Sequence, residues 1–123
     1  MTFGFRDREL RVLAGYSTPL YETIAEVVDY DCYQLGRLHP DVLQNTTLID
    51  IGANVGVTTL CLAQFPQARV LSFEPDPDNC ARLEANLRQN GASNVTVVRK
   101  AVFGSSAWDT YSRSKPIRSA GPP

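Results

Sequence analysis

The chain has 123 residues, of which 43% are hydrophobic and 20% are charged. That length suits one small domain and is too short for most two-domain enzymes. The sequence carries 12 basic and 13 acidic side chains, for a net charge of -1. Proteins dedicated to nucleic acids usually carry a strong basic excess, so we expect no nucleic-acid partner.

Cysteine and histidine are too sparse for a disulfide framework or a metal site. Cys32, Cys61 and Cys80 form no Cys-x-x-Cys pair, and His39 is the single histidine. We therefore expect reduced thiols in a cytoplasmic protein and no bound metal. No apolar run approaches the roughly 20 residues that span a bilayer, and charges at positions 6–9 interrupt any signal-peptide core, so we expect no membrane association.

Residues 1–46 are interpreted as an N-terminal cap with a helical segment. Thr18 and Pro19 are typical of a helix start. Four apolar residues would then share one face of the helix: Leu20, Ile24, Val27 and Val28. The competing interpretation is an irregular cap that contains a strand, because residues 27–28 and 30–35 are rich in strand-forming types. We favour the helix.

Residues 47–103 alternate between strands and helices. Short apolar or β-branched runs predict buried strands at 47–51, 69–73 and 95–99. A short helix is expected at 57–64. A second helix is expected to begin at Pro77, with Asp76 as its N-cap, and to stop at Asn90-Gly91. This alternation is half of a doubly wound parallel sheet.

The most informative motif lies where the first of these strands turns into the first helix. The run is Asp50-Ile51-Gly52-Ala53-Asn54-Val55-Gly56, and Glu74 follows the next strand. The two glycines let the backbone turn tightly and approach a ligand, and asparagine is one of the few other residues that tolerates positive φ. The two oxygens of Glu74 could accept hydrogen bonds from a ribose diol. We therefore expect a site for an adenosine-containing ligand at this edge of the sheet.

The residue types favour a cationic ligand over a dinucleotide. A dinucleotide fingerprint would need glycine at positions 52, 54 and 57, and the chain has Asn54 and Val57. Asp50 is expected to face the pocket, where it would repel an anion and favour the ammonium or sulfonium group of S-adenosylmethionine. A simpler interpretation stays open, in which Asp50 only bonds loop amides and Glu74 is a solvated charge at a strand end.

Three runs together resemble the FkbM-type methyltransferases. They are residues 48–56, Phe73-Glu74-Pro75-Asp76-Pro77 and residues 83–90, followed by Ala101-Val102. The resemblance covers roughly residues 20–103 and implies an α/β Rossmann-like methyltransferase fold that uses S-adenosylmethionine to methylate a hydroxyl of a small molecule or sugar. It implies that the methionyl and ribose portion is bordered by Asp50, Gly52, Asn54 and Gly56, with Ala53 in the same run. It also implies that Glu74 holds the ribose hydroxyls and that the backbone around Ala101 lies near the adenine.

The chain departs from that family after the third strand. Residues 104–123 are rich in serine and proline, lack apolar periodicity and are expected to form a disordered tail. The family's later strands, its acidic Asp-x-Glu-Gly segment and the half that supplies the acceptor pocket have no counterpart. We therefore expect the fold to be truncated after about three parallel strands, and a non-catalytic binding or interaction remnant stays open as a second function. A nicotinamide-dependent oxidoreductase is a third, disfavoured by the missing glycine.

No catalytic base can be named from the sequence. His39 precedes a proline near a loop, which is typical of a surface residue. Asp29, Asp31 and Tyr33 lie in a region that could cover the pocket, but structural roles are favoured for each.

The strand at 47–51 is expected to have an unpaired edge. In the strand order 3-2-1-4-5 the first strand is central. Here it would lack one neighbour, unless the N-terminal segment or another chain covers it. An exposed apolar edge promotes association, so we expect the chain to be unstable or to self-associate when it is expressed alone.

Overall fold

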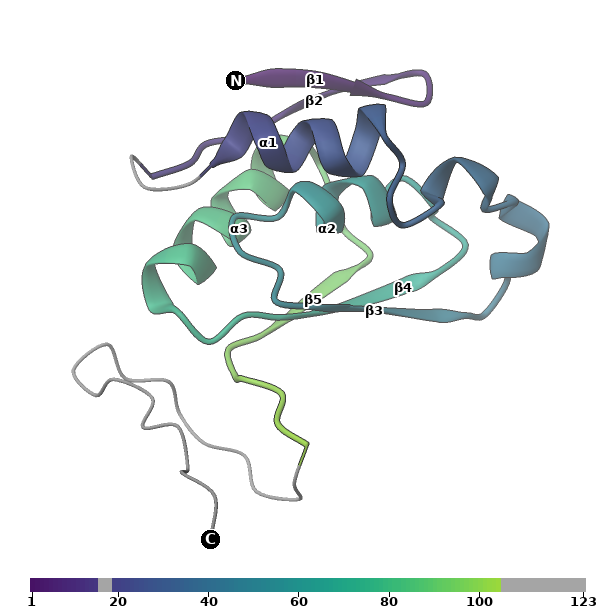
Figure 1. The fold of residues 1–123 in the computed structure, drawn as a ribbon. Coiled ribbons are helices and arrows are strands. Elements are labelled where there is room, and N and C mark those ends of the chain that lie inside the picture. The colour runs from purple at the N-terminus through teal and green to yellow at the C-terminus, as the bar shows by residue number, and fades with distance from the viewer. Residues whose placement is uncertain (16–18, 105–123) are drawn as a thin grey trace, which may run out of the picture.

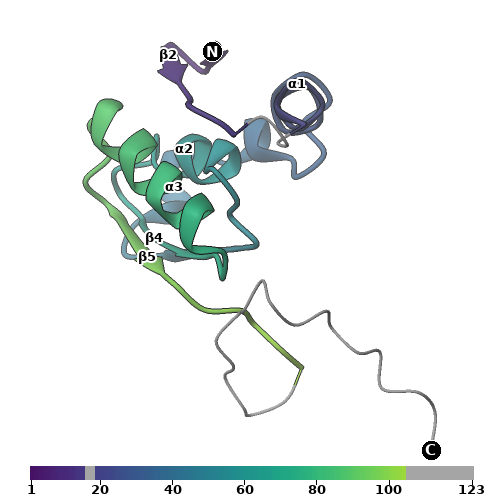
Figure 2. The same ribbon diagram turned by 90° about the vertical axis from the view of Figure 1, so that its left-hand side faces the viewer.

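The computed structural model describes residues 1–15 and 19–104. The helices α2 and α3 lie between a parallel sheet on one side and the N-terminal hairpin and α1 on the other (Figures 1 and 2). The strands and α-helices are β1 (Thr2–Phe5), β2 (Arg8–Arg11), α1 (Leu20–Ile24), β3 (Thr47–Ile51), α2 (Val57–Leu62), β4 (Arg69–Phe73), α3 (Pro77–Gln89) and β5 (Val95–Val98).

The parallel sheet has the order β3-β4-β5, which confirms the three predicted strands. Its register sets Ile49 beside Leu71 and Leu71 beside Thr96. Side chains alternate along each strand, so Asp50 and Ser72 are buried while Ile49 is exposed on the other face. The third strand ends at Val98, one residue earlier than expected.

Both predicted helices of this unit are present. The Asp76 side chain accepts hydrogen bonds from Asp78 N and Asn79 N at 2.9 and 3.0 Å, and Gly91 follows the helix at φ 66°. These contacts satisfy backbone groups that the ends of α3 would otherwise leave unpaired. The first helix, α2, ends at Leu62 rather than at position 64. Among the described residues, no helix is both long and apolar enough to traverse a bilayer.

The N-terminal segment is helical where a helix was favoured over a strand. The helix begins at Leu20 after Pro19, and Thr18 lies outside the described residues. It continues as a π-helical turn over Ala25–Asp29, and two short 3-10 turns follow at Leu35–Arg37 and Pro40–Leu43.

The hairpin β1–β2 was not predicted. Phe3, Phe5 and Leu10 are buried and alternate with exposed residues, which is the period of a half-buried strand. The two strands are only four residues long, and charged residues rather than glycine form the turn between them. The sequence pattern was therefore too short to predict a hairpin.

The N-terminal segment and the βαβαβ unit share one hydrophobic core. Phe5 meets Phe65 edge to face with ring centroids 6.5 Å apart, and Leu10, Val27 and Leu83 belong to the same buried cluster. Within the described residues, no break in this core separates residues 1–46 from residues 47–103. The division between these two parts stays a prediction from the sequence. Of the expected tail, only Gly104 is among the described residues.

The face of the sheet opposite α2 and α3 carries no helix in the part of the chain that the structure describes (Figures 1 and 2). Ile49 and Ile51 on this face are 59% and 63% exposed, and Leu71 and Phe73 beside them are half-buried. Among the described strands, β3 pairs with β4 alone. An apolar face and an apolar edge thus meet along β3.

We expect the chain to self-associate through this edge and face. Ile49→Lys should reduce association, because it charges the exposed edge without removing buried packing. Sedimentation velocity should show concentration-dependent oligomers for the parent and fewer for I49K. The matched control is Val42→Lys, which charges another exposed aliphatic residue away from the sheet and should leave association unchanged. A parent chain that stays monomeric and melts cooperatively would contradict the prediction.

Candidate cofactor site

The chain turns sharply between β3 and α2 through a glycine loop, residues 52–56. Gly52 N and Ala53 N both donate to Phe73 O, at 2.9 and 3.0 Å, which ties the start of the loop to the end of β4. Gly52, Asn54 and Gly56 have φ values of 79°, 52° and 99°. Each takes the left-handed conformation that glycine and asparagine tolerate best, as the sequence predicted.

The two glycines have different reasons to lack a side chain. A Cβ added at Gly52 would have no atom within 4 Å, so the backbone there is open to a ligand. A Cβ at Gly56 would collide with Leu83 Cδ1. Glycine at position 56 therefore allows α2 to pack closely against α3, while Gly52 leaves room at the site.

Glu74 is buried, with 6% exposure, and both of its oxygens accept backbone hydrogen bonds. Oε2 accepts from Asn54 N at 2.7 Å and Oε1 accepts from Asp76 N at 2.9 Å. Its interpretation as a solvated strand-end charge is therefore wrong. Since a carboxylate oxygen can accept more than one hydrogen bond, each oxygen retains capacity for a ligand hydroxyl.

Asp50 is turned differently from what the sequence analysis expected. Its carboxylate accepts from Thr59 Oγ1 at 2.6 Å, and Thr59 Oγ1 lies 3.0 Å from Ser72 Oγ. The side chain is 9% exposed and is packed beneath α2, where it contacts helix and sheet rather than facing the pocket. Burial raises the pKa of Asp50, the Thr59 hydrogen bond lowers it, and the charge of Glu74 raises it again.

A cavity of about 210 Å³ separates the glycine loop from the N-terminal helical segment. The loop side is formed by residues 52–58, and the other side by Leu20, Thr23, Glu26, Val27 and Tyr33. Among the residues that line it, Glu26 is the one charged side chain, so the lining suits a cation better than an anion.

Sequence reasoning missed Glu26 and expected a structural role for Tyr33. Thr23 and Glu26 are three residues apart and therefore lie on one helical face, next to the apolar residues that anchor the segment. That spacing could have marked the pair as neighbours. It could not show that the helix would face the glycine loop.

Other candidates lie outside the cavity. Ala101 is half-buried and follows β5, so it lies at the carboxyl ends of the strands, where the glycine loop and Glu74 also lie. His39 is exposed, and its Nδ1 accepts from Asp41 N at 3.3 Å, so it caps a 3-10 turn. Asp29 and Asp31 do not line the cavity. In residues 1–15 and 19–104, no group of three metal-ligating side chains is assembled.

Comparison with known proteins leads to methyltransferases. No protein-family profile matches the chain. The chain is similar to the methyltransferase sdnD of Sordaria araneosa, with 32% identity over 83 residues, which are 67% of this chain and 30% of that protein. It is also similar in structure to precorrin-6y C5,15-methyltransferase from Geobacter metallireducens GS-15, with a TM-score of 0.54 and 20% identity over 72% of this chain and 43% of that one. A third likeness is to coclaurine N-methyltransferase, with a TM-score of 0.50 and 23% identity over 71% of this chain and 25% of that one.

The chain has a Rossmann-like methyltransferase fold. The fold class predicted from the sequence is therefore confirmed. The chain spans 30% of the length of the curated relative that it matches. The sequence likeness extends over 83 residues, and the structural likenesses show the fold.

The two loop glycines should differ in their tolerance of alanine. Gly56→Ala should lower the free energy of unfolding by about 2–4 kcal/mol, because left-handed strain adds to the collision with Leu83. Gly52→Ala is the matched control and should cost about 1–2 kcal/mol from strain alone. Urea unfolding of the three proteins measures both losses. Equal losses would contradict the assignment of Gly56 to packing.

Asp50 should make stability decline as pH rises. A carboxyl group whose pKa is raised in the folded state binds its proton more firmly there. Its favourable contribution is complete below the unfolded pKa and is lost as pH rises through the folded pKa. Asp50→Asn removes this titration and keeps an oxygen for Thr59. We expect D50N to gain stability relative to the parent as pH rises above about 4, measured by urea unfolding at each pH.

The matched control for that series is Asp29→Asn, which alters an exposed carboxylate outside the cavity. A D50N difference that varies with pH no more than the D29N difference would show that Asp50 does not carry the pH dependence.

Proposed function

We propose that the chain is the cofactor-binding part of an S-adenosylmethionine-dependent methyltransferase of the FkbM type. The proposed acceptor is a hydroxyl of a small molecule or sugar, with no nucleic-acid substrate. The observation that carries the proposal is the open backbone at Gly52, beside an acidic cavity and next to Glu74 at the carboxyl ends of β3 and β4. The three runs that resemble the FkbM type, together with the fold, support it.

The residues present fit parts of this cofactor. The cavity of about 210 Å³ is smaller than most small-molecule pockets, which measure about 300–1,000 Å³. We therefore assign it the methionyl end. Glu74 would accept hydrogen bonds from the ribose hydroxyls, and the backbone around Ala101 would lie near the adenine.

The acidic groups have a common electrostatic role in this proposal. S-adenosylmethionine, when bound, supplies a methyl group on a positively charged sulfur. Glu26 at the cavity, with Asp50 and Glu74 beneath it, would favour a cation through their charges. Methyl transfer chiefly demands orientation of the two reactants, and the loop, which is bonded to Glu74 through Asn54 N, would supply a surface that orients the cofactor.

We also propose a cytoplasmic location, which rests on the thiols. Cys32 is exposed and Cys61 and Cys80 are buried, all unpaired. Burial raises the pKa of Cys61 to about 12 and also raises that of Cys80, so both stay protonated at neutral pH. Three free thiols suit a reducing compartment.

Isothermal titration with S-adenosylhomocysteine tests the cofactor. We expect Glu74→Gln to weaken binding roughly 10- to 100-fold, because a buried carboxylate that accepts ligand hydroxyls becomes neutral. The matched control is Glu9→Gln, on the exposed side of β2, which should bind like the parent. No heat from folded parent protein at high micromolar ligand would contradict the proposal.

Glu74 also holds the glycine loop through Asn54 N, so a second variant is needed to test binding of the cofactor without changing that bond. Glu26→Gln alters an exposed side chain at the cavity. It should weaken S-adenosylmethionine a few-fold more than S-adenosylhomocysteine, since only the former carries a sulfonium. Equal effects on the two ligands would remove Glu26 from recognition of the charged sulfur.

A further inference from the structure

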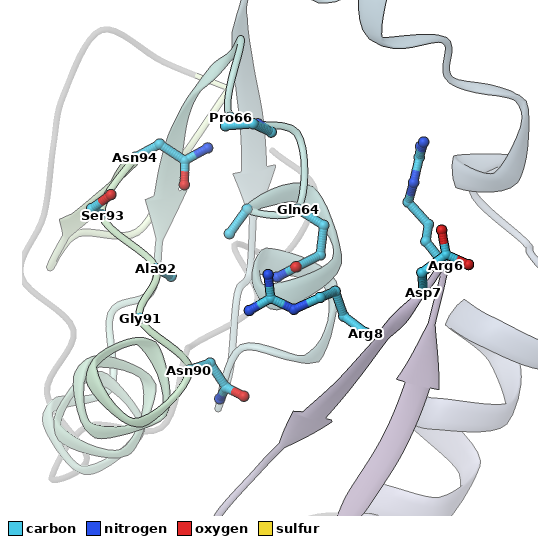
Figure 3. Close-up of a pocket in the computed structure, with 11 residues that line it drawn as sticks. Arg6, Asp7, Arg8, Gln64, Pro66, Asn90, Gly91, Ala92, Ser93 and Asn94 are labelled. Atoms are coloured by element: carbon cyan, nitrogen blue, oxygen red, sulfur yellow. The ribbon is translucent and has the colours of Figure 1, made fainter.

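A second, larger cavity lies at the other end of the molecule from the glycine loop. It measures about 460 Å³ and is lined by the turn of the hairpin, the end of α2 and the segment that leads from α3 into β5 (Figure 3). This segment, residues 90–94, precedes β5, and Pro66 precedes β4, so the cavity lies at the amino ends of the strands. None of its lining residues belongs to the glycine-loop cavity.

The charge of this cavity is opposite to that of the candidate cofactor site. Arg6 and Arg8 line it, with Asp7 as its single carboxylate. Neither arginine forms an ion pair with a carboxylate in the part of the chain that the structure describes. A chain with a net charge of -1 thus presents a local cationic site.

The side chains of Arg6 and Arg8 extend from the hairpin in different directions (Figure 3). The Arg6 guanidinium lies over the Phe65 ring, with its carbon 4.7 Å from the ring centroid, and the side chain points away from Arg8 (Figure 3). Arg8 extends from the hairpin into the cavity, toward Gln64 and the segment 90–94 (Figure 3). Its guanidinium is the group best placed to contact a ligand.

The three segments that line the cavity are fixed relative to one another. Asn90 Oδ1 accepts from Arg11 N at 2.8 Å, and Asn90 Nδ2 donates to Arg11 O at 2.6 Å, which joins the hairpin to the end of α3. Asn94 Nδ2 donates to Phe65 O and Ala68 O, both at 3.1 Å, which joins the segment 90–94 to the chain between α2 and β4. These bonds hold the cavity open between elements that are distant in sequence.

The geometry points to a binding site for a small organic phosphate in this cavity. A guanidinium offers parallel N–H groups that match two phosphate oxygens, and Arg6 adds a second positive charge. The Ser93 hydroxyl and the Asp7 carboxylate, which also line the cavity, suit the hydroxyl groups of a sugar. The volume lies within the range of about 300–1,000 Å³ that small-molecule pockets occupy. The site is independent of the proposed cofactor site.

Titration calorimetry of the full chain with ribose 5-phosphate and with inorganic phosphate, at constant ionic strength, tests this site. We expect ribose 5-phosphate to bind more tightly than inorganic phosphate. Arg8→Gln should weaken ribose 5-phosphate about tenfold or more, because a charge-assisted bidentate contact is lost. The matched control is Arg37→Gln, which removes an exposed charge outside this cavity and should leave the affinity unchanged.

NMR signals, competition between ligands and the R8Q variant distinguish this site from the proposed cofactor site. Ribose 5-phosphate should shift the backbone NMR signals of residues 91–94 and leave those of residues 52–58 in place. S-adenosylhomocysteine should neither compete with it nor respond to R8Q. Absence of binding for both phosphates, or an equal loss in R8Q and R37Q, would overturn the site. Equal affinity for the two phosphates would overturn the inference that the site recognises the organic part of the ligand.

Discussion

The buried side-chain amide of Asn86 is the contact on which the arrangement of the three parts of this protein depends. Asn86 is fully buried in α3, and its Oδ1 accepts from Leu13 N at 2.8 Å while its Nδ2 donates to Leu13 O at 2.9 Å and Val55 O at 2.8 Å. One side chain therefore joins the segment after the hairpin, the helix and the glycine loop. Each buried partner left unsatisfied would cost about 1–3 kcal/mol, so these segments are held in one relative position. Val55, which lines the cavity beside the glycine loop, is thereby fixed relative to α3 and to Leu13.

The glycine loop depends on a second buried side chain, Glu74, and the two acidic groups beneath the loop influence each other. Glu74 holds Asn54 N, and its charge contributes to the raised pKa of Asp50, whose proton affinity burial already increases. Asp50 is bonded to Thr59 beneath α2, so its effect on a ligand would be electrostatic rather than by direct contact. Two buried carboxylates close together are unfavourable, and a bound cation would reduce that cost. The acidic character of this end contrasts with the two arginines at the opposite end of the sheet.

The edge position of β3 connects the site to the expected association of the chain. The glycine loop begins where β3 ends, and within the described residues its sheet-side anchor is the carbonyl of Phe73 on β4. Ile49 and Ile51, next to Asp50, are exposed on the face that α2 and α3 do not cover. The strand that forms the site is therefore also the strand with the most exposed apolar surface, and whatever covers that surface will adjoin the loop.

The sequence by itself determined the local structure of this protein. Within residues 47–103, the β-branched runs, the N-cap at Asp76 and the stop at Gly91 predicted the strands and helices to within two residues, because these signals act over a few neighbouring residues. The positive φ values at Gly52, Asn54 and Gly56 followed from the same short-range rules, and the parallel sheet followed from the alternation of strands and helices.

Only the tertiary structure decided where side chains from distant segments meet. It turned Asp50 toward Thr59, brought Glu26 to the glycine loop and used Gly56 to admit Leu83. It also placed the short hairpin over the helices, where Phe3 and Phe5 become buried. A periodic pattern shows which face of an element is apolar, but the identity of the element that covers that face depends on packing between residues far apart in the chain.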